Sequence, residues 1–232
     1  MKPEILVLWP IFAPTLAMLE QQYVVHKLWL APDREAMLKE LATRVRGVVT
    51  TGLKGCEAAT MDALSKLEII ASFGSPRNTL DVAAARARNI ICTRTPDAIT
   101  ESVADLALGL MIDVMRRINA GDRFIRAGRW EKELARPGNE VRGKRCGIVG
   151  FGRIGQGVAK RAAAFDMAIS YFGPNKKDSP LPYYNDLAAM AAAVDVLVVC
   201  CPLTPQTRDL VDAKVIEALG ADAFLVNVAL VL

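Results

Sequence analysis

The sequence predicts an α/β protein with two parallel β-sheets. Short apolar runs alternate with helical patterns from the N-terminus onward, and this alternation is typical of strands joined by crossover helices. A long helical run, Ala104 to about Arg117, interrupts the pattern, which restarts at Val141. In the second half a glycine-rich turn, residues 150–155, stands between a strand and a helix, as a dinucleotide-binding turn does. We therefore expect two α/β domains, the second with a nucleotide site.

The first half contains five expected strands and three expected helices. Asp33 and Asp81 stand where a helix N-terminus needs a capping side chain. Pro10 and Pro14 interrupt the apolar stretch at the N-terminus, so we interpret it as a strand followed by the start of a helix, and not as a signal peptide. The strands are Ile5–Trp9, Tyr23–Leu28, Gly47–Thr51, Leu67–Phe73 and Ile90–Thr93. The helices are Asp33–Arg44, Ala58–Leu67 and Asp81–Arg88.

The second half begins with the long helical run and continues with four expected strands. The run from Ala104 is apolar on most faces, so we expect it to be buried on several sides. Residues 131–139 have little regularity and are expected to form a loop or arm. The strands are Arg145–Val149, Ala168–Phe172, Asp195–Cys200 and Phe224–Val228. The helices between them are Ile154–Phe165, Asp186–Ala193 and Ala213–Leu219.

Composition is that of a globular protein and argues against several kinds of partner. Of the 232 residues, 52% are hydrophobic and 23% are charged, which allows a buried core. The net charge is only +4, and the basic segment Arg116–Trp130 has no nucleic-acid-reading motif. Neither nucleic acid nor a membrane is expected as a partner. The five cysteines show no C-x-x-C spacing, so we expect free thiols in a reducing cytoplasm and no metal site.

Each glycine of the turn Gly150-Phe151-Gly152-Arg153-Ile154-Gly155 has an expected role. Gly150 permits the tight turn, Gly152 lets the backbone approach a pyrophosphate, and Gly155 lets the helix pack closely on the strand. The helix that begins at Arg153 and Ile154 presents free N–H groups to the anion. We therefore predict that these five residues bind a nucleotide that carries a diphosphate.

The loop after the next strand predicts which nucleotide is bound. NAD-binding turns are followed about twenty residues later by an acidic residue that binds the ribose 2′-hydroxyl. This chain has Gly173-Pro174-Asn175-Lys176-Lys177 instead, and the two ammonium groups favour a 2′-phosphate. We predict NADP in preference to NAD, with Gly173, Asn175, Lys176 and Lys177 at the site. If Lys176 and Lys177 are merely exposed loop lysines, NAD remains the alternative.

Several stretches along the chain match a known pattern in order. They are DVAAARAR at 81–88, TESVADLALGL at 100–110, the turn with the KRA at 160–162, CPLTPQTR at 201–208 and NVA at 227–229. The chain thereby resembles the D-isomer-specific 2-hydroxyacid dehydrogenases, in particular their glyoxylate and hydroxypyruvate reductase branch. The resemblance implies a flavodoxin-like substrate domain over residues 1–97 and a Rossmann coenzyme domain over residues 98–232. It also implies hydride transfer between a nicotinamide and the α-carbon of a 2-keto or 2-hydroxy acid, in a homodimer formed through the coenzyme domains.

The resemblance also assigns residues to the coenzyme cleft. Cys201, Pro202 and Thr207 are expected to line it, and Val228 and Ala229 are expected to place backbone groups near the nicotinamide. These positions would complete the site that begins at the glycine turn.

The family's catalytic groups have no counterpart in the 232 residues. Where the family has an arginine that clamps the substrate carboxylate, this chain has Leu230, and the family's acid and histidine would lie beyond Leu232. Reduction of a keto acid needs a proton donor, and the one histidine, His26, lies in a predicted strand of the first domain. We therefore expect a C-terminally truncated, inactive form. The competing hypothesis is a non-catalytic, coenzyme-binding scaffold that dimerises.

Two further expectations concern the substrate loop and the edge of the second sheet. The family binds the substrate carboxylate with backbone N–H groups of a Gly-x-Gly loop, but here the loop is Gly74-Ser75-Pro76-Arg77, and Pro76 has no N–H. Either Arg77 compensates, or carboxylate binding is impaired, or the loop turns differently. In the second sheet we expect the order 3-2-1-4, with Phe224–Val228 as an exposed apolar edge.

Overall fold

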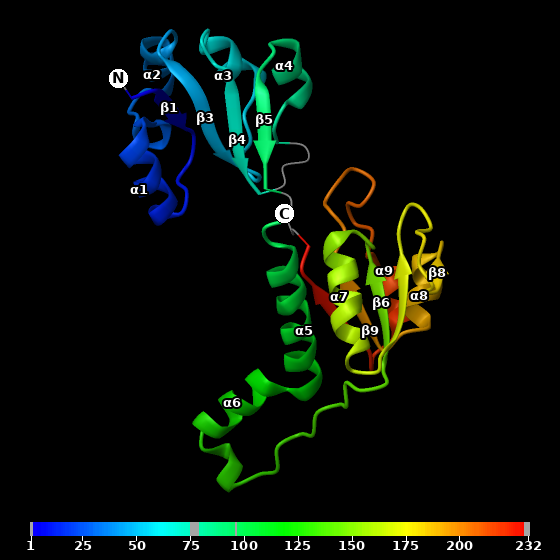
Figure 1. Cartoon of the computed structure of the whole chain (residues 1–232). Coiled ribbons are helices and arrows are strands. Elements are labelled where there is room, and N and C mark those ends of the chain that lie inside the picture. The colour runs from blue at the N-terminus through cyan, green and yellow to red at the C-terminus, as the bar shows by residue number, and fades with distance from the viewer. Residues whose placement is uncertain (1, 75–78, 96, 230–232) are drawn as a thin grey trace. The chain divides into compact units, whose positions relative to one another are not determined.

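The computed structural model describes residues 2–74, 79–95 and 97–229, and it confirms the predicted α/β fold class (Figure 1). The chain forms two compact units, Met1–Ala98 and Ile99–Leu232. Each unit contains one five-stranded sheet. All strand pairs found among the described residues are parallel, so each successive strand requires a crossover connection.

The sheet of the first unit has the order β2-β1-β3-β4-β5. This is the flavodoxin-like order, in which the chain reverses direction across the sheet between β1 and β3. Leu6, Val48 and Ile70, from the three central strands, are buried in its core. The strands are β1 (Glu4–Val7), β2 (Val24–Lys27), β3 (Val45–Thr51), β4 (Ile69–Phe73) and β5 (Ile91–Arg94).

The helices of the first unit begin where the sequence predicts capping residues. The Asp33 side chain accepts hydrogen bonds from the amides of Glu35 and Ala36, and Asp81 accepts one from the amide of Ala84, as N-caps do. The helix expected to reach residue 67 is shorter, because Leu64 leaves helical geometry at φ −114° and ψ 82°. The helices are α1 (Ala13–Gln22), η1 (Leu28–Leu30), α2 (Arg34–Leu41), α3 (Ala58–Ala63) and α4 (Val82–Ala87).

The sheet of the second unit has the order β10-β9-β6-β7-β8 and corrects one expectation. The order 3-2-1-4 was wrong, because it omitted β8, which pairs with β7 through only two tyrosines. A strand this short has no detectable alternation in sequence. With β8 counted, the order becomes 3-2-1-4-5, and β10 lies at the end of the sheet as expected. The strands are β6 (Arg145–Val149), β7 (Ala168–Phe172), β8 (Tyr183–Tyr184), β9 (Val196–Val199) and β10 (Phe224–Asn227).

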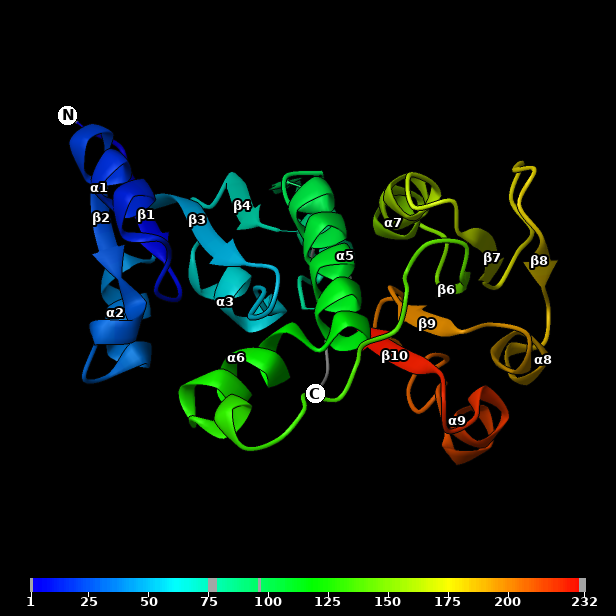
Figure 2. The ribbon, with the colours of Figure 1, turned by 90° about the horizontal axis from the view of Figure 1, so that it is seen from below.

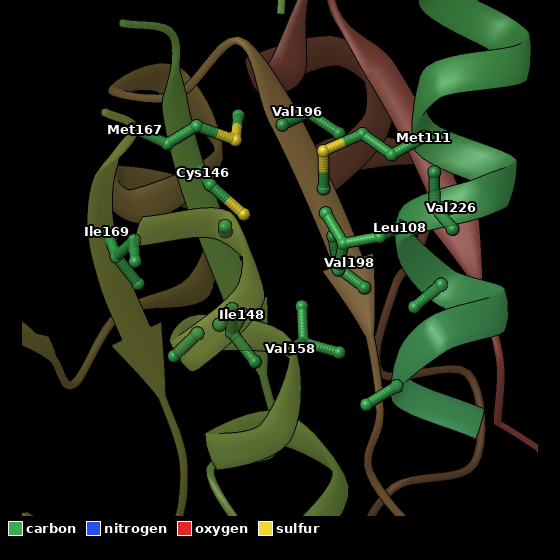
Figure 3. Close-up of a cluster of buried hydrophobic side chains, with 14 of the residues drawn as sticks. Leu108, Met111, Cys146, Ile148, Val158, Met167, Ile169, Val196, Val198 and Val226 are labelled. Atoms are coloured by element: carbon green, nitrogen blue, oxygen red, sulfur yellow. The ribbon is translucent and has the colours of Figure 1, made fainter. Parts of the chain in front are cut away.

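Helices cover both faces of this sheet. On one face, side chains of α5 and α7 meet those of β6, β9 and β10, and Figure 3 shows Leu108, Met111 and Val158 among them. On the other face, α8 and α9 pack against β6 and β9 through residues such as Met190 and Val215. The helices are α5 (Thr100–Arg116), α6 (Ile118–Arg126), η2 (Arg129–Glu131), α7 (Arg153–Ala163), α8 (Leu187–Ala192) and α9 (Ala213–Leu219).

Helix α5 is buried along one face and not on several sides, which corrects the sequence-based expectation. Ala104, Leu108 and Met111 are buried against the sheet. Leu106, Leu110 and Val114, one helical turn apart, remain 54%, 38% and 43% exposed. The apolar residues of α5 therefore form two surfaces on the helix. Other described residues cover only one of them. We call Leu106, Leu110 and Val114 the α5 stripe.

Two short helical elements, α6 and η2, follow α5 within the second unit, and we call them the arm. Arg117 takes a left-handed conformation, with φ +59°, and separates α5 from α6. In both views α6 and the segment after it extend away from the sheet of this unit (Figures 1 and 2). Within the described residues, no helix has the length and hydropathy required to cross a bilayer.

Candidate functional site

The glycine-rich turn lies where the second sheet offers a ligand site. It follows the carboxyl end of β6 and leads into α7, with Gly152 at the N-cap position. In the sheet, β6 has β7 on one side and β9 on the other, so the chain's direction across the sheet reverses between β6 and β9. Open α/β sheets bind ligands outside the carboxyl ends of their strands at such a switch point.

Gly150 allows the backbone after β6 to approach the backbone after β9. Its φ is +94°, a conformation that side chains disfavour. A Cβ on Gly150 would lie 2.7 Å from both the amide nitrogen and the Cα of Cys201, which is too close for any side chain. The tight turn predicted for Gly150 is therefore required by contact between two strand ends.

Gly155 and Gly152 differ in what surrounds them. A Cβ on Gly155 would lie 2.3 Å from the carbonyl oxygen of Gly150, so α7 can pack on β6 only with glycine there. A Cβ on Gly152 would meet no protein atom within 4 Å. The protein itself thus gives no packing reason for Gly152, and the open space beside it can admit a ligand close to the backbone.

The N-terminus of α7 is suited to an anion. No side chain caps it, and its first turn contains no acidic residue. The first N–H groups of a helix have no partner within the helix, and the helix dipole makes this end positive. Arg153 and Ile154 open the helix, so their amides lie at this positive end. A phosphate or diphosphate group satisfies both conditions.

Residues 173–177 follow β7 and are the loop that the sequence predicts to lie near the ribose; we call them the ribose loop. Gly173 is buried, whereas Asn175, Lys176 and Lys177 are exposed. The hydroxyl of Tyr171 accepts a hydrogen bond from the Lys177 amide at 2.8 Å, and the hydroxyl of Tyr183 donates one to the Gly173 carbonyl at 3.0 Å. The sequence analysis did not assign either tyrosine to the site, because a tyrosine in a strand is most simply interpreted as a core residue.

The segment after β9 forms a hollow that contains four of the expected cleft residues. Cys201, Pro202, Thr207 and Ala229 line a space of about 280 Å³ at the carboxyl ends of β9 and β10. Thr207 mainly holds its own loop, since its hydroxyl donates to the Pro202 carbonyl at 2.5 Å and accepts from the Thr204 amide at 2.8 Å.

Val228 lies apart from this hollow and packs against the core on the α5 side. Its amide donates to the Val199 carbonyl at 3.1 Å, which extends the pairing of β10 with β9. Leu230, at the position of the family's arginine, lies outside the described residues.

The cysteines near the site are not activated nucleophiles. All five cysteines carry free thiols. Burial raises the pKa of Cys146 and of Cys200 to about 12, and burial also raises the pKa of Cys201. These thiols therefore stay protonated near neutral pH, and a protonated thiol neither attacks carbon nor binds metals well. Among the described residues, no group of three or more potential metal ligands was found.

The substrate loop of the first unit is only partly described. Gly74 follows β4 with φ +99°. Its amide donates to the hydroxyl of Thr95 at 2.9 Å, and the Thr95 amide donates to the Gly74 carbonyl at 3.1 Å. The Gly74 N–H is thus already paired within the protein. Ser75, Pro76 and Arg77 lie outside the described residues, so their expected roles remain predictions.

His26 takes part in an ion-pair cluster at the amino end of the first sheet. Its Nε2 lies 2.8 Å from Oε2 of Glu4, the first residue of β1, and the Arg44 guanidinium lies 2.9 Å from the same oxygen. Hydrogen bonds from Arg44 and then from His26 lower the pKa of Glu4. His26 is the third residue of β2, and its pairing with Glu4 and Arg44 side chains favours a structural role.

The chain belongs to the D-isomer-specific 2-hydroxyacid dehydrogenases. The family model described as "D-isomer specific 2-hydroxyacid dehydrogenase, NAD binding domain" matches residues 108–230, which is more than half of the chain. This match contains the glycine turn, the ribose loop and the segment after β9. The second unit is therefore similar to domains that bind a nicotinamide dinucleotide.

Individual relatives agree with the family assignment. A hydroxyphenylpyruvate reductase of Plectranthus scutellarioides is 39% identical over 90% of this chain and 67% of its own length. The solved 2-hydroxyacid dehydrogenase of Ketogulonicigenium vulgare is 38% identical, with a TM-score of 0.93 over 99% of this chain and 73% of that one. An NADPH-dependent glyoxylate/hydroxypyruvate reductase of Sinorhizobium meliloti, solved with NADP and malonate, is 34% identical, with a TM-score of 0.82 over 99% and 72%.

Two glycine substitutions should separate binding from folding. Gly152 has φ −86°, and a methyl group added there would have open space around it. We therefore expect Gly152→Ala to change the free energy of unfolding by less than about 0.5 kcal/mol. The methyl group stands where the diphosphate would approach, so coenzyme affinity should fall about tenfold or more. Gly150→Ala should instead lower the free energy of unfolding by more than about 1 kcal/mol.

Urea denaturation and coenzyme titration of both variants provide the measurements. A Gly152→Ala variant that binds coenzyme as tightly as the wild type would show that the backbone does not approach the diphosphate there.

Proposed function

We propose that the chain has the binding framework of an NADPH-dependent reductase of short 2-keto acids, of the glyoxylate or hydroxypyruvate type. The observation that carries this proposal is the empty space beside Gly152 at the uncapped N-terminus of α7. A diphosphate fits that site by both shape and charge. When bound, the coenzyme supplies the hydride that passes to the keto carbon, and the carbonyl oxygen then takes a proton.

The loop after β7 supports NADP over NAD. Lys176 and Lys177 are exposed next to the carboxyl end of β7, where the ribose of a bound dinucleotide is expected. Two ammonium groups favour a 2′-phosphate over a neutral hydroxyl. The similar reductase from Sinorhizobium meliloti, which is NADPH-dependent, agrees with this choice.

We also propose a separate binding function for each of the two units. We assign residues 1–97 to the substrate and residues 98–232 to the coenzyme, with Cys201, Pro202, Thr207, Val228 and Ala229 on the coenzyme side. The Gly74 amide is already bonded to Thr95 and so is not available to a substrate carboxylate. The free thiols support a reducing compartment such as the cytoplasm.

The 232 residues by themselves are proposed to bind coenzyme without reducing keto acids. Their one histidine, His26, lies in β2 of the first unit and is bound to Glu4. The thiols near the turn are held protonated by burial and are poor proton donors near neutral pH. His26 and these thiols are thus unsuited to protonate the product.

Direct binding and turnover measurements test this function. We expect nicotinamide fluorescence to report weak NADPH binding, and mixtures of NADPH with glyoxylate or hydroxypyruvate to react no faster than without protein. Turnover at the rate of an ordinary reductase would contradict the proposed inactivity. Tight NADPH binding without turnover would instead favour the alternative function, a coenzyme-binding scaffold. Absence of any coenzyme binding would refute both.

Replacing the two loop lysines tests coenzyme choice. The double substitution Lys176→Ala with Lys177→Ala should weaken NADPH binding about tenfold, because charge-assisted hydrogen bonds to the 2′-phosphate are lost. NADH binding should change less than about twofold. Lys214→Ala removes an equally exposed lysine of α9 and serves as the matched control. Equal losses for NADPH and NADH would leave NAD as the better choice.

The α5 stripe supports a homodimer formed through the second unit. Leu106, Leu110 and Val114 present an exposed apolar row, and Ile125 and Trp130 of the adjoining arm are each 60% exposed. A contiguous exposed apolar surface is typical of a protein interface. The basic side chains of the arm then border this interface rather than bind nucleic acid.

Sedimentation velocity tests the dimer. The wild-type chain should sediment as a dimer, whereas Val114→Lys should sediment as a monomer because an ammonium group would be buried in an apolar contact. Met18→Lys, on α1 and 62% exposed in the wild type, is the matched control and should remain dimeric. A wild-type monomer at micromolar concentration would contradict the homodimer.

A further inference from the structure

Tyr171 connects the two loops that are expected to hold the coenzyme. It is the fourth residue of β7, and it is fully buried between β6 and β8, opposite Ile148 and Tyr183. Its hydroxyl nevertheless reaches the loop that follows β7. There it accepts a hydrogen bond from the Lys177 amide at 2.8 Å and donates one to the Lys177 carbonyl at 3.3 Å.

The ring of Tyr171 also contacts the glycine turn. It stacks on Phe151, the second residue of that turn, with ring centroids 4.3 Å apart and an angle of 22° between the planes. The ring centroid of Tyr183 lies 5.4 Å from that of Tyr171. Stacked and tilted aromatic pairs at these distances are attractive beyond their burial. One side chain therefore joins the diphosphate turn to the ribose loop.

The ribose loop is held at both of its ends by this group. The Tyr183 hydroxyl donates to the Gly173 carbonyl at 3.0 Å, and the Tyr171 hydroxyl binds both backbone groups of Lys177. The residues between these ends, 174–176, are exposed. The backbone of Lys177 is thus held by hydrogen bonds that a phenylalanine at position 171 cannot make.

We infer that Tyr171 is a positioning residue for coenzyme selection, which fixes the Lys177 backbone so that the loop lysines face the 2′-position of the ribose. The inference rests on the proposed coenzyme function. Without the Tyr171 hydroxyl the loop stays attached to the sheet at Gly173, but its Lys177 end is free to move. The lysines then spend less time near the 2′-phosphate, while contacts to the rest of the nucleotide are unchanged.

The substitution Tyr171→Phe tests this role because it removes one hydroxyl and keeps the aromatic stack on Phe151. The probes are 2′,5′-ADP and ADP, since the first carries the 2′-phosphate and the second does not. The ratio of their dissociation constants should move about fivefold toward one in the variant, as expected for the loss of a neutral hydrogen bond. The Lys177 amide should also exchange its hydrogen faster.

Tyr184→Phe is the matched control. Tyr184 is the neighbouring residue of β8, and no hydrogen bond of its hydroxyl is found among the described residues. Its substitution should leave the ratio unchanged. In a background that carries Lys176→Ala and Lys177→Ala, Tyr171→Phe should no longer alter the ratio, because the groups that it positions are absent.

The outcomes separate this inference from the proposed function. If the wild type prefers 2′,5′-ADP but Tyr171→Phe only lowers Tm and leaves the ratio unchanged, Tyr171 is a core residue and the inference is wrong. If the wild type prefers ADP, the NADP proposal is wrong and the coenzyme-selecting role of Tyr171 is wrong with it; faster exchange of the Lys177 amide in Tyr171→Phe would then show only that Tyr171 holds the loop. If the wild type binds both probes equally or neither, both proposals are overturned.

Discussion

The close approach of two backbone segments at the carboxyl ends of β6 and β9 is the constraint on which the candidate site depends. Gly150 touches the backbone of Cys201, and Gly155 touches the carbonyl of Gly150, so neither position has room for a side chain. These contacts place the first turn of α7 close to the sheet at the switch point. Gly152 is different, because its open side is the only one of the three that protein atoms do not fill. Close packing at Gly150 and Gly155 and open space at Gly152 thus occur within six residues of the chain.

The candidate site joins a closely packed turn to an exposed loop. A turn made of backbone amides recognises a diphosphate in any dinucleotide, so it cannot distinguish one coenzyme from another. Discrimination has to come from side chains near the ribose, and long lysine side chains on a loop lose conformational entropy when they bind. The hydrogen bonds of Tyr171 and Tyr183 reduce that loss by fixing the loop backbone beforehand. In the proposed site, the turn for the common part of the ligand and the loop for its distinguishing part are therefore connected by the aromatic rings of Phe151, Tyr171 and Tyr183.

Much of the fold could be predicted from sequence, because most elements carry a local pattern. The aspartate caps, the apolar strands and the glycine turn all depend on residues within a few positions of one another. Two elements were predicted incorrectly for a common reason. The pairing of β8 is determined by its neighbour β7, since two residues carry no periodicity of their own. The exposure of Leu106 and Val114 on α5 depends on which face the sheet covers, and apolar residues on all sides of a helix do not reveal that.

The sequence by itself determined the α/β class, the position of the nucleotide turn and the family, because each depends on residue types at short, fixed spacings. It also determined that His26 is the one histidine of the 232 residues. Only the tertiary structure decided that His26 pairs with Glu4, that the Gly74 amide is already bonded to Thr95, and that Tyr171 reaches the ribose loop. Each of these contacts joins residues from different strands or loops, and spacing along a chain does not specify which side chains packing brings within hydrogen-bond distance.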